Sequence, residues 1–251
     1  MRWRGIENTL RKALYQSKRF PADMVLDPFI AIPKVIHRTG YGISAKTQSL
    51  GAEDSTARSQ SYINQLLELE DVSKILDERV THDETQTALR LEEAEKIFGD
   101  LAPVRAVGCE FHLGVWDKIA TFMGADECYY AMYDNPEPLH ATLDRITTAT
   151  ISGIEDANRL GLHNDIANLC HCSHIYTDEL LPDSGAGRGP QSQNCWAFGL
   201  AQIFTACSPG HFEEFELPYI SRMAEYFGMI YYGCCDRLDD RLPANWRSKI
   251  T

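Results

Sequence analysis

Carboxylate, imidazole and thiol side chains follow three apolar segments of the sequence. These side chains are Glu110, His112, Cys170, His171, Cys172, Cys234 and Cys235. Thiolate and imidazole are the usual protein ligands of zinc, and a zinc-bound thiol is deprotonated at neutral pH. A nearby carboxylate or imidazole can act as a general acid or base. The residue types therefore point to a zinc–thiolate site with acid–base groups beside it.

The spacing of these groups favours a catalytic zinc site over a structural one. Paired C-x-x-C knuckles are absent from the sequence, whereas a catalytic zinc needs three protein ligands and one open position. The expected metal ligands are Cys234, Cys235, His171 and Cys172. Three other interpretations stay open: buried thiols that act as small apolar side chains, a strained disulfide between the adjacent cysteines, and hydrogen-bonded histidines at strand ends. The sequence has no Walker loop, no G-x-G-x-x-G and no nucleophile elbow.

The elements that must position these groups alternate along the chain. Apolar, β-branched segments predict strands over 24–32, 103–112, 165–172 and 229–235. Helical periodicity predicts helices over 5–20, 83–98, 115–123, 136–160 and 209–227, and residues 38–61 are expected to form a long loop. This alternation predicts an α/β fold with a parallel sheet. Ligands of such folds bind at the carboxyl ends of the strands, where the polar groups above would meet.

Composition excludes several classes of protein. The chain has 251 residues, 24 basic and 36 acidic, and a net charge of −12, which argues against nucleic acid and anionic lipid as partners. No apolar run reaches the roughly 20 residues that span a bilayer. Because the eight cysteines occur without a secretory signal, reduced thiols and a cytoplasmic location are expected. The length suits one domain over 1–251.

The sequence resembles the uroporphyrinogen decarboxylase superfamily, most of all its branch of anaerobic bacterial proteins related to corrinoid-dependent methyltransferases. The strings that carry the resemblance lie at 10–37, 81–108, 171–182, 196–219 and 225–240. The resemblance implies a (β/α)8 TIM barrel with its site at the carboxyl ends of the strands. Such proteins are usually longer, and only five or six strands are expected here. The barrel is therefore expected to be incomplete at both ends.

The methyltransferase branch implies a zinc thiolate that activates a thiol and exchanges a methyl group with a corrinoid on a partner protein. Its zinc motif is a His-x-Cys at a late strand, where Gly233 takes the place of the histidine and Cys235 matches the cysteine. Under this interpretation the catalytic groups are Glu110, His112 and Asp178, and the substrate-binding residues are Trp116, Tyr176 and Tyr232.

Two alternatives remain beside the methyltransferase. One is a lyase of porphyrin metabolism similar to uroporphyrinogen decarboxylase. It is disfavoured because the chain lacks that branch's Arg-rich N-terminal motif, and a tetrapyrrole with many carboxylates needs a basic pocket. The other is a non-catalytic partial barrel that docks on a corrinoid protein or on a second chain that completes the barrel.

Overall fold

The computed structural model describes residues 3–21, 26–49, 60–165, 180, 189–234 and 237–242, which form a mixed α/β structure. The α-helices are α1 Arg4–Arg19, α2 Glu84–Phe98, α3 Val115–Met123, α4 Ala125–Asp134, α5 Pro136–Leu160, α6 Pro209–Phe215 and α7 Leu217–Ala224. The strands are β1 Ile30–Pro33, β2 Ile36–Arg38, β3 Thr47–Ser49, β4 Gln60–Tyr62, β5 Val80–His82, β6 Val104–Val107, β7 Trp196–Gly199 and β8 Met229–Tyr232. Short 3-10 helices are η1 Leu69–Lys74, η2 Ser192–Asn194 and η3 Gln202–Ala206.

Four of the described strands run parallel. β1 pairs with β6, and β7 pairs with β8. The chain beyond β6 links the two pairs, because Cys109 forms a parallel bridge with His163 and His112 forms one with Phe198. The predicted parallel α/β arrangement is therefore present, and the described strands do not close into a barrel. The remaining strands form two antiparallel pairs, β2 with β5 and β3 with β4.

The two faces of the β7–β8 pair have different environments. Ala197, Ile230 and Tyr232 belong to the main hydrophobic core, which includes side chains of α6 and α7. Phe198 belongs to a separate small cluster with Leu200, and Tyr231 packs against that cluster. Because successive strand residues point to opposite faces, one face of this pair packs on helices and the other carries Phe198 and Tyr231.

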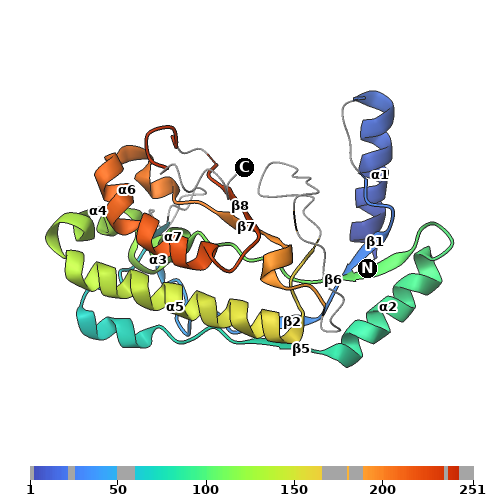
Figure 1. Ribbon diagram of the computed structural model, residues 1–251, viewed down its shortest axis with the longest axis horizontal. Coiled ribbons are helices and arrows are strands. Elements are labelled where there is room, and N and C mark those ends of the chain that lie inside the picture. Colours follow the sequence, from blue (N-terminus) through green and yellow to red (C-terminus); the bar gives the residue numbers. More distant parts are fainter. Residues whose placement is uncertain are drawn as a thin grey trace.

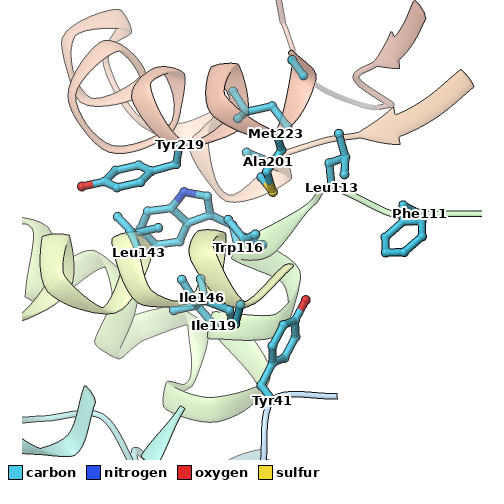
Figure 2. Packing of buried hydrophobic residues seen from close by; sticks show 14 of the residues in the cluster. Tyr41, Phe111, Leu113, Trp116, Ile119, Leu143, Ile146, Ala201, Tyr219 and Met223 are labelled. Carbon is cyan, nitrogen blue, oxygen red and sulfur yellow. The ribbon is translucent and has the colours of Figure 1, made fainter. Parts of the chain in front are cut away.

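Helix α5 has 25 residues and packs along the main core (Figure 1). Its apolar residues recur every three or four positions, Pro136 starts it, and Gly161 ends it in a left-handed conformation with φ 62°. Trp116 of α3 lies between Leu143 of α5 and Tyr219 of α7 (Figure 2). No helix among the described residues is long and apolar enough to cross a membrane.

Some predicted bounds are wrong for physical reasons. The helix expected over 209–227 is two helices, because Pro218 in the first turn of α7 has no N–H to continue the α6 ladder. The strand expected over 24–32 begins only at Ile30, after Pro28, and residues 22–25 lie outside the described set. The expected loop over 38–61 contains β3 and the start of β4, while 50–59 lie outside the described residues. Of the strand expected over 165–172, only residue 165 is described.

Candidate functional site

His112 lies at the end of the extended chain that continues β6. It is bridged to Phe198 of β7, which is itself in register with Tyr231 of β8. The three rings form a row, with centroids 4.8 Å apart for His112 and Phe198 and 5.7 Å apart for Phe198 and Tyr231. This row lies on the face of the β7–β8 pair that is turned away from the helical core. The structure therefore surrounds a predicted catalytic residue with aromatic neighbours.

One hydrogen bond orients the His112 ring. The Gly114 N–H donates to His112 Nδ1 at 3.1 Å, so the neutral imidazole carries its proton on Nε2. Nε2 lies 3.8 Å from Asp117 Oδ2 on the first turn of α3. Gly114 is required at this position, because a Cβ there would lie 2.5 Å from His112 Cε1. His112 can therefore present a proton at the carboxyl edge of the parallel strands.

Glu110 shares the strand end with His112. Its side chain is exposed, and Oε1 accepts a hydrogen bond from the Asn164 side-chain amide at 2.8 Å. Asn164 follows the bridge between Cys109 and His163, and its N–H donates to the Cys109 carbonyl at 3.0 Å. Adjacent parallel segments thus place the Glu110 carboxylate and the Asn164 carboxamide together.

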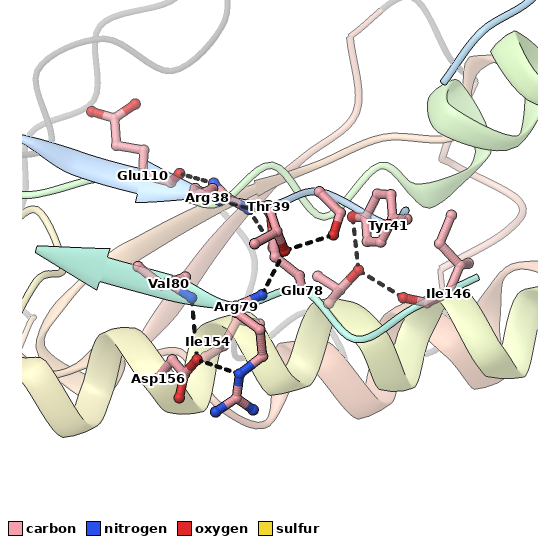
Figure 3. Close-up of polar contacts among 12 residues, drawn as sticks. Arg38, Thr39, Tyr41, Glu78, Arg79, Val80, Glu110, Ile146, Ile154 and Asp156 are labelled. Atoms are coloured by element: carbon pink, nitrogen blue, oxygen red, sulfur yellow. Dashed lines mark hydrogen bonds and ion pairs between the residues drawn. The ribbon is translucent and has the colours of Figure 1, made fainter. Parts of the chain in front are cut away.

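Arg38 contacts the segment that carries Glu110 and His112 (Figure 3). Its guanidinium makes two hydrogen bonds to the buried Glu78 carboxylate, at 2.7 and 2.9 Å, and a third to the Glu110 carbonyl at 3.2 Å. It also lies 4.2 Å from the centroid of the Phe111 ring. Burial lowers the pKa of Arg38, but the bonds and charge of Glu78 outweigh burial and the pKa is raised. Arg38 is therefore a charged anchor beneath the strand end.

The same region is tied to α5 by a second carboxylate. Asp156 accepts a hydrogen bond from the Val80 N–H at 3.1 Å and lies 3.2 Å from Arg79 Nε. Figure 3 shows this contact below the Arg38 network, between β5 and α5. Because β5 pairs with β2, which ends in Arg38, α5 fixes the strand from which Arg38 projects.

Cys234 follows β8 at the same edge of the sheet. It is half-buried, and the preceding Gly233 donates its N–H to the Gly199 carbonyl at 2.9 Å. Gly233 has φ 101°, and a Cβ there would lie 2.5 Å from Leu238 Cδ1. A histidine at 233, as the family motif has it, would be strained in this conformation. The backbone of residue 233 therefore favours glycine over the histidine of that motif.

Five of the expected site residues lie outside the described residues: Cys235, His171, Cys172, Asp178 and Tyr176. Within the described residues, no three His, Cys, Asp or Glu side chains are grouped so as to hold a metal ion. β7 lies between the segment that carries His112 and β8. Two strand spacings, or about 9 Å, therefore separate the backbones of these two segments.

Trp116 and Tyr232, the other expected substrate-binding residues, are core side chains here. Trp116 is 1% exposed and donates its indole N–H to the Phe215 carbonyl at 3.2 Å. Tyr232 is 5% exposed and donates its hydroxyl to Glu216 Oε1 at 2.7 Å. Neither is brought together with His112. On β8 it is the neighbouring Tyr231 that joins the aromatic row.

Several groups near the strand ends were not predicted from the sequence. Asn164 and Arg38 act on Glu110, as described above. Lys34 follows β1 and donates to the Gly161 carbonyl at 3.1 Å, and burial lowers its pKa despite the opposing charge of Asp165. Lys34 had a usable signal, since it is a charged residue directly after a predicted strand. Arg38 had none, because its partners are distant in sequence.

The isolated cysteines in the described part of the chain behave as apolar side chains. Burial raises the pKa of Cys128 to about 12 and also raises the pKa of Cys109 and of Cys207. These thiols are therefore protonated at neutral pH and are poor nucleophiles. No disulfide joins two described cysteines.

Comparison of the chain with protein-family models, with curated proteins and with solved structures finds no match.

Proposed function

We propose that this chain is a zinc–thiolate methyltransferase built on a (β/α)8-type arrangement similar to that of the uroporphyrinogen decarboxylase superfamily. One observation carries the proposal: His112 and Cys234 follow parallel segments, the continuation of β6 and β8, on either side of β7 and at the same edge. This is the edge at which α/β enzymes bind their ligands. A thiol and an imidazole that presents an N–H there suit a reaction in which a substrate thiolate is stabilised.

Zinc fits the chemistry of the expected donors. Cys234 offers a half-buried thiol, and Cys235 with His171 or Cys172 would complete three ligands. When bound, zinc supplies a redox-inert Lewis acid that stabilises a thiolate, which can then exchange a methyl group with a corrinoid on a partner protein. In this proposal His112 is not a ligand and instead donates a hydrogen bond from Nε2 beside the metal site.

The chain's own groups have distinct roles in this proposal. His112 donates a hydrogen bond from Nε2 to the substrate sulfur, because Nδ1 accepts the Gly114 N–H and the neutral ring carries its proton on Nε2. Glu110 is held by Asn164 and can balance charge beside it. Arg38 is a positioning residue, since it contacts the Glu110 carbonyl and the Phe111 ring rather than the open edge. The row of His112, Phe198 and Tyr231 offers a substrate apolar contact next to these polar groups.

A porphyrinogen lyase is the second candidate, and the described arginines favour it less. A substrate with many carboxylates needs cations that are available to it. Arg38 is paired with Glu78, and Arg105 on β6 is paired with Asp165. Decarboxylation of a porphyrinogen by the purified chain would nonetheless establish the lyase.

Metal content is the test of the zinc site. The reduced chain, purified without oxygen, should contain about one zinc per molecule by elemental analysis, since a catalytic zinc site binds one ion. Replacing both Cys234 and Cys235 by alanine should remove the metal. The matched control is Cys207→Ala, a half-buried thiol whose Sγ contacts the Ile203 carbonyl instead.

The outcomes separate the candidates. Zinc that is stoichiometric in the wild type and in Cys207→Ala but lost from the double variant supports the proposal. Stoichiometric zinc in the double variant, or no zinc in the wild type, refutes it. A folded, metal-free chain that binds a corrinoid protein in size-exclusion chromatography would instead identify the non-catalytic partial barrel.

A further inference from the structure

Helix α1 projects from the body of the molecule (Figure 1). None of its 16 residues is buried, although the helix is amphipathic. Leu10 is 38% exposed and Leu14 is 61% exposed. Its first turn alone is anchored: Trp3 packs on Phe98 and Ile6 joins the same cluster. Large apolar side chains therefore line the rest of the helix without a described partner in the same chain.

A helix of this length needs packing to be stable in water. Isolated helices of about 15 residues are marginal even when rich in alanine, and most helical stability in proteins comes from a packed amphipathic face. The charges of α1 indicate which surface would cover that face. The helix has five basic residues and one acidic residue, in a chain whose net charge is −12. Arg4, Arg11 and Lys18 recur every seven residues and so form a row along one flank of the Leu10–Leu14 stripe.

A cavity of about 270 Å³ offers the complementary surface. It lies against α4, the start of α5 and the segment before η1, and its lining includes Leu67, Met123, Glu127, Tyr130, Asp134 and Leu139. Leu67 is 49% exposed and Tyr130 is 63% exposed. Two acidic residues of α4, Glu127 and Asp134, line this cavity. The cavity thus combines apolar side chains with negative charge, whereas the α1 face combines apolar side chains with positive charge.

The spacing of the charges also matches. Glu127 and Asp134 are seven residues apart on α4, as Arg11 and Lys18 are on α1, which is about 10.5 Å along either helix. The chain cannot make this contact with itself, because α1 and α4 lie at opposite ends of the long axis (Figure 1). Two copies placed antiparallel bring each α1 to the other's cavity, which closes the assembly as a twofold dimer.

We propose that two copies of this chain form such a dimer, in which Leu10 and Leu14 of each α1 cover the cavity beside α4 of the other copy. Arg11, which is paired with the exposed Glu7 at 2.8 Å on its own helix, and Lys18 then pair with Glu127 and Asp134. This inference does not depend on the proposed enzymatic function, since no residue of the His112 or Cys234 region takes part.

Charge exchange tests the dimer directly. Sedimentation equilibrium of the full chain should give about twice the 28.3 kDa of one copy, and higher salt should weaken the association. Replacing Arg11 and Lys18 by glutamate should weaken it by at least about tenfold. Replacing Glu127 and Asp134 by lysine should do the same, and combining the two sets should restore the dimer. The control is Lys12→Glu with Arg19→Glu, the same charge change on the opposite face of α1.

Each result decides for or against the dimer. Loss with either set, recovery with both and little change in the control support it. A monomeric wild type overturns it, as does a dimer that resists either set or a combined variant that stays monomeric. A monomer that binds phosphatidylserine vesicles through Arg11 and Lys18 also overturns it and assigns α1 to a membrane. Thermal unfolding followed by circular dichroism confirms that each variant is folded before it is compared.

Discussion

Helices α5 and α1 are both amphipathic, but they occupy opposite environments. Eleven of the 25 residues of α5 are buried, and both ends of the helix are fixed, by Pro136 and by Gly161. None of the 16 residues of α1 is buried, and within the described residues its apolar packing on the body of the chain lies at its start, where Trp3 and Ile6 join the cluster around Phe98. The apolar stripe of a helix thus predicts that the face needs a partner, while the location of that partner depends on contacts far away in the sequence.

Equal truncations in the two helices should give unequal losses, and the α5 change should be the largest effect. Leu143 of α5 is fully buried and packs in the main core with Trp116. Leu143→Ala removes contacts and leaves a void, so it should lower the free energy of unfolding by about 2–5 kcal/mol. Urea unfolding followed by circular dichroism measures the change. A loss below about 1 kcal/mol would mean that Leu143 of α5 is not packed in the core.

The core should also respond to acid. His163 is 1% exposed, between Phe111 and Phe227, and burial lowers its pKa from 6.5 to about 4. Between these values the unfolded chain binds a proton that the folded chain excludes. Burial of neutral His163 therefore costs nothing above pH 6.5, and the free energy of unfolding falls as the pH is lowered from 6.5 toward 4. The loss should be on the order of 3 kcal/mol.

Urea unfolding at a series of pH values between 4 and 7 measures the slope. His163→Gln should flatten the slope whatever it does to the stability at neutral pH. The same replacement at His211, on α6, is the control and should leave the slope in place. Asp156, whose pKa is lowered, and His82, whose pKa burial lowers, contribute to the slope of both proteins, so the difference between wild type and His163→Gln reports on His163. An unchanged slope in His163→Gln would show that His163 is not the group responsible.

Long periodic elements could be predicted from the sequence, whereas short ones could not. The helix expected over 136–160 coincides with α5, because 25 residues of helical periodicity leave no competing pattern. The strands β2 and β5 have three residues each and were missed, since such a length carries no periodicity. Helix α4 was missed as well, and its sequence mixes polar and aromatic residues without a clear stripe.

The candidate site was predictable at the level of strand ends but not of side-chain direction. The strand expected over 103–112 ends at Val107, and Glu110 and His112 lie on the extended chain that follows it. The sequence could not distinguish Tyr231 from Tyr232, because a shift of one residue along a strand reverses the face, and only Tyr231 joins the row with His112. Arg38 could not be assigned either, because Glu78 is 40 residues away from it and Glu110 is 72 residues away.

The smallest stability effect is expected on the exposed face of α1. Leu14 is 61% exposed, so Leu14→Ala should change the unfolding free energy of the monomer by less than about 0.5 kcal/mol. The same change should weaken the proposed dimer, because Leu14 is buried only there. Sedimentation and unfolding of this one variant thus report on two different surroundings of the same leucine. A loss in the monomer as large as that of Leu143→Ala would instead mean that α1 folds back onto its own chain, and the contrast between the two helices would disappear.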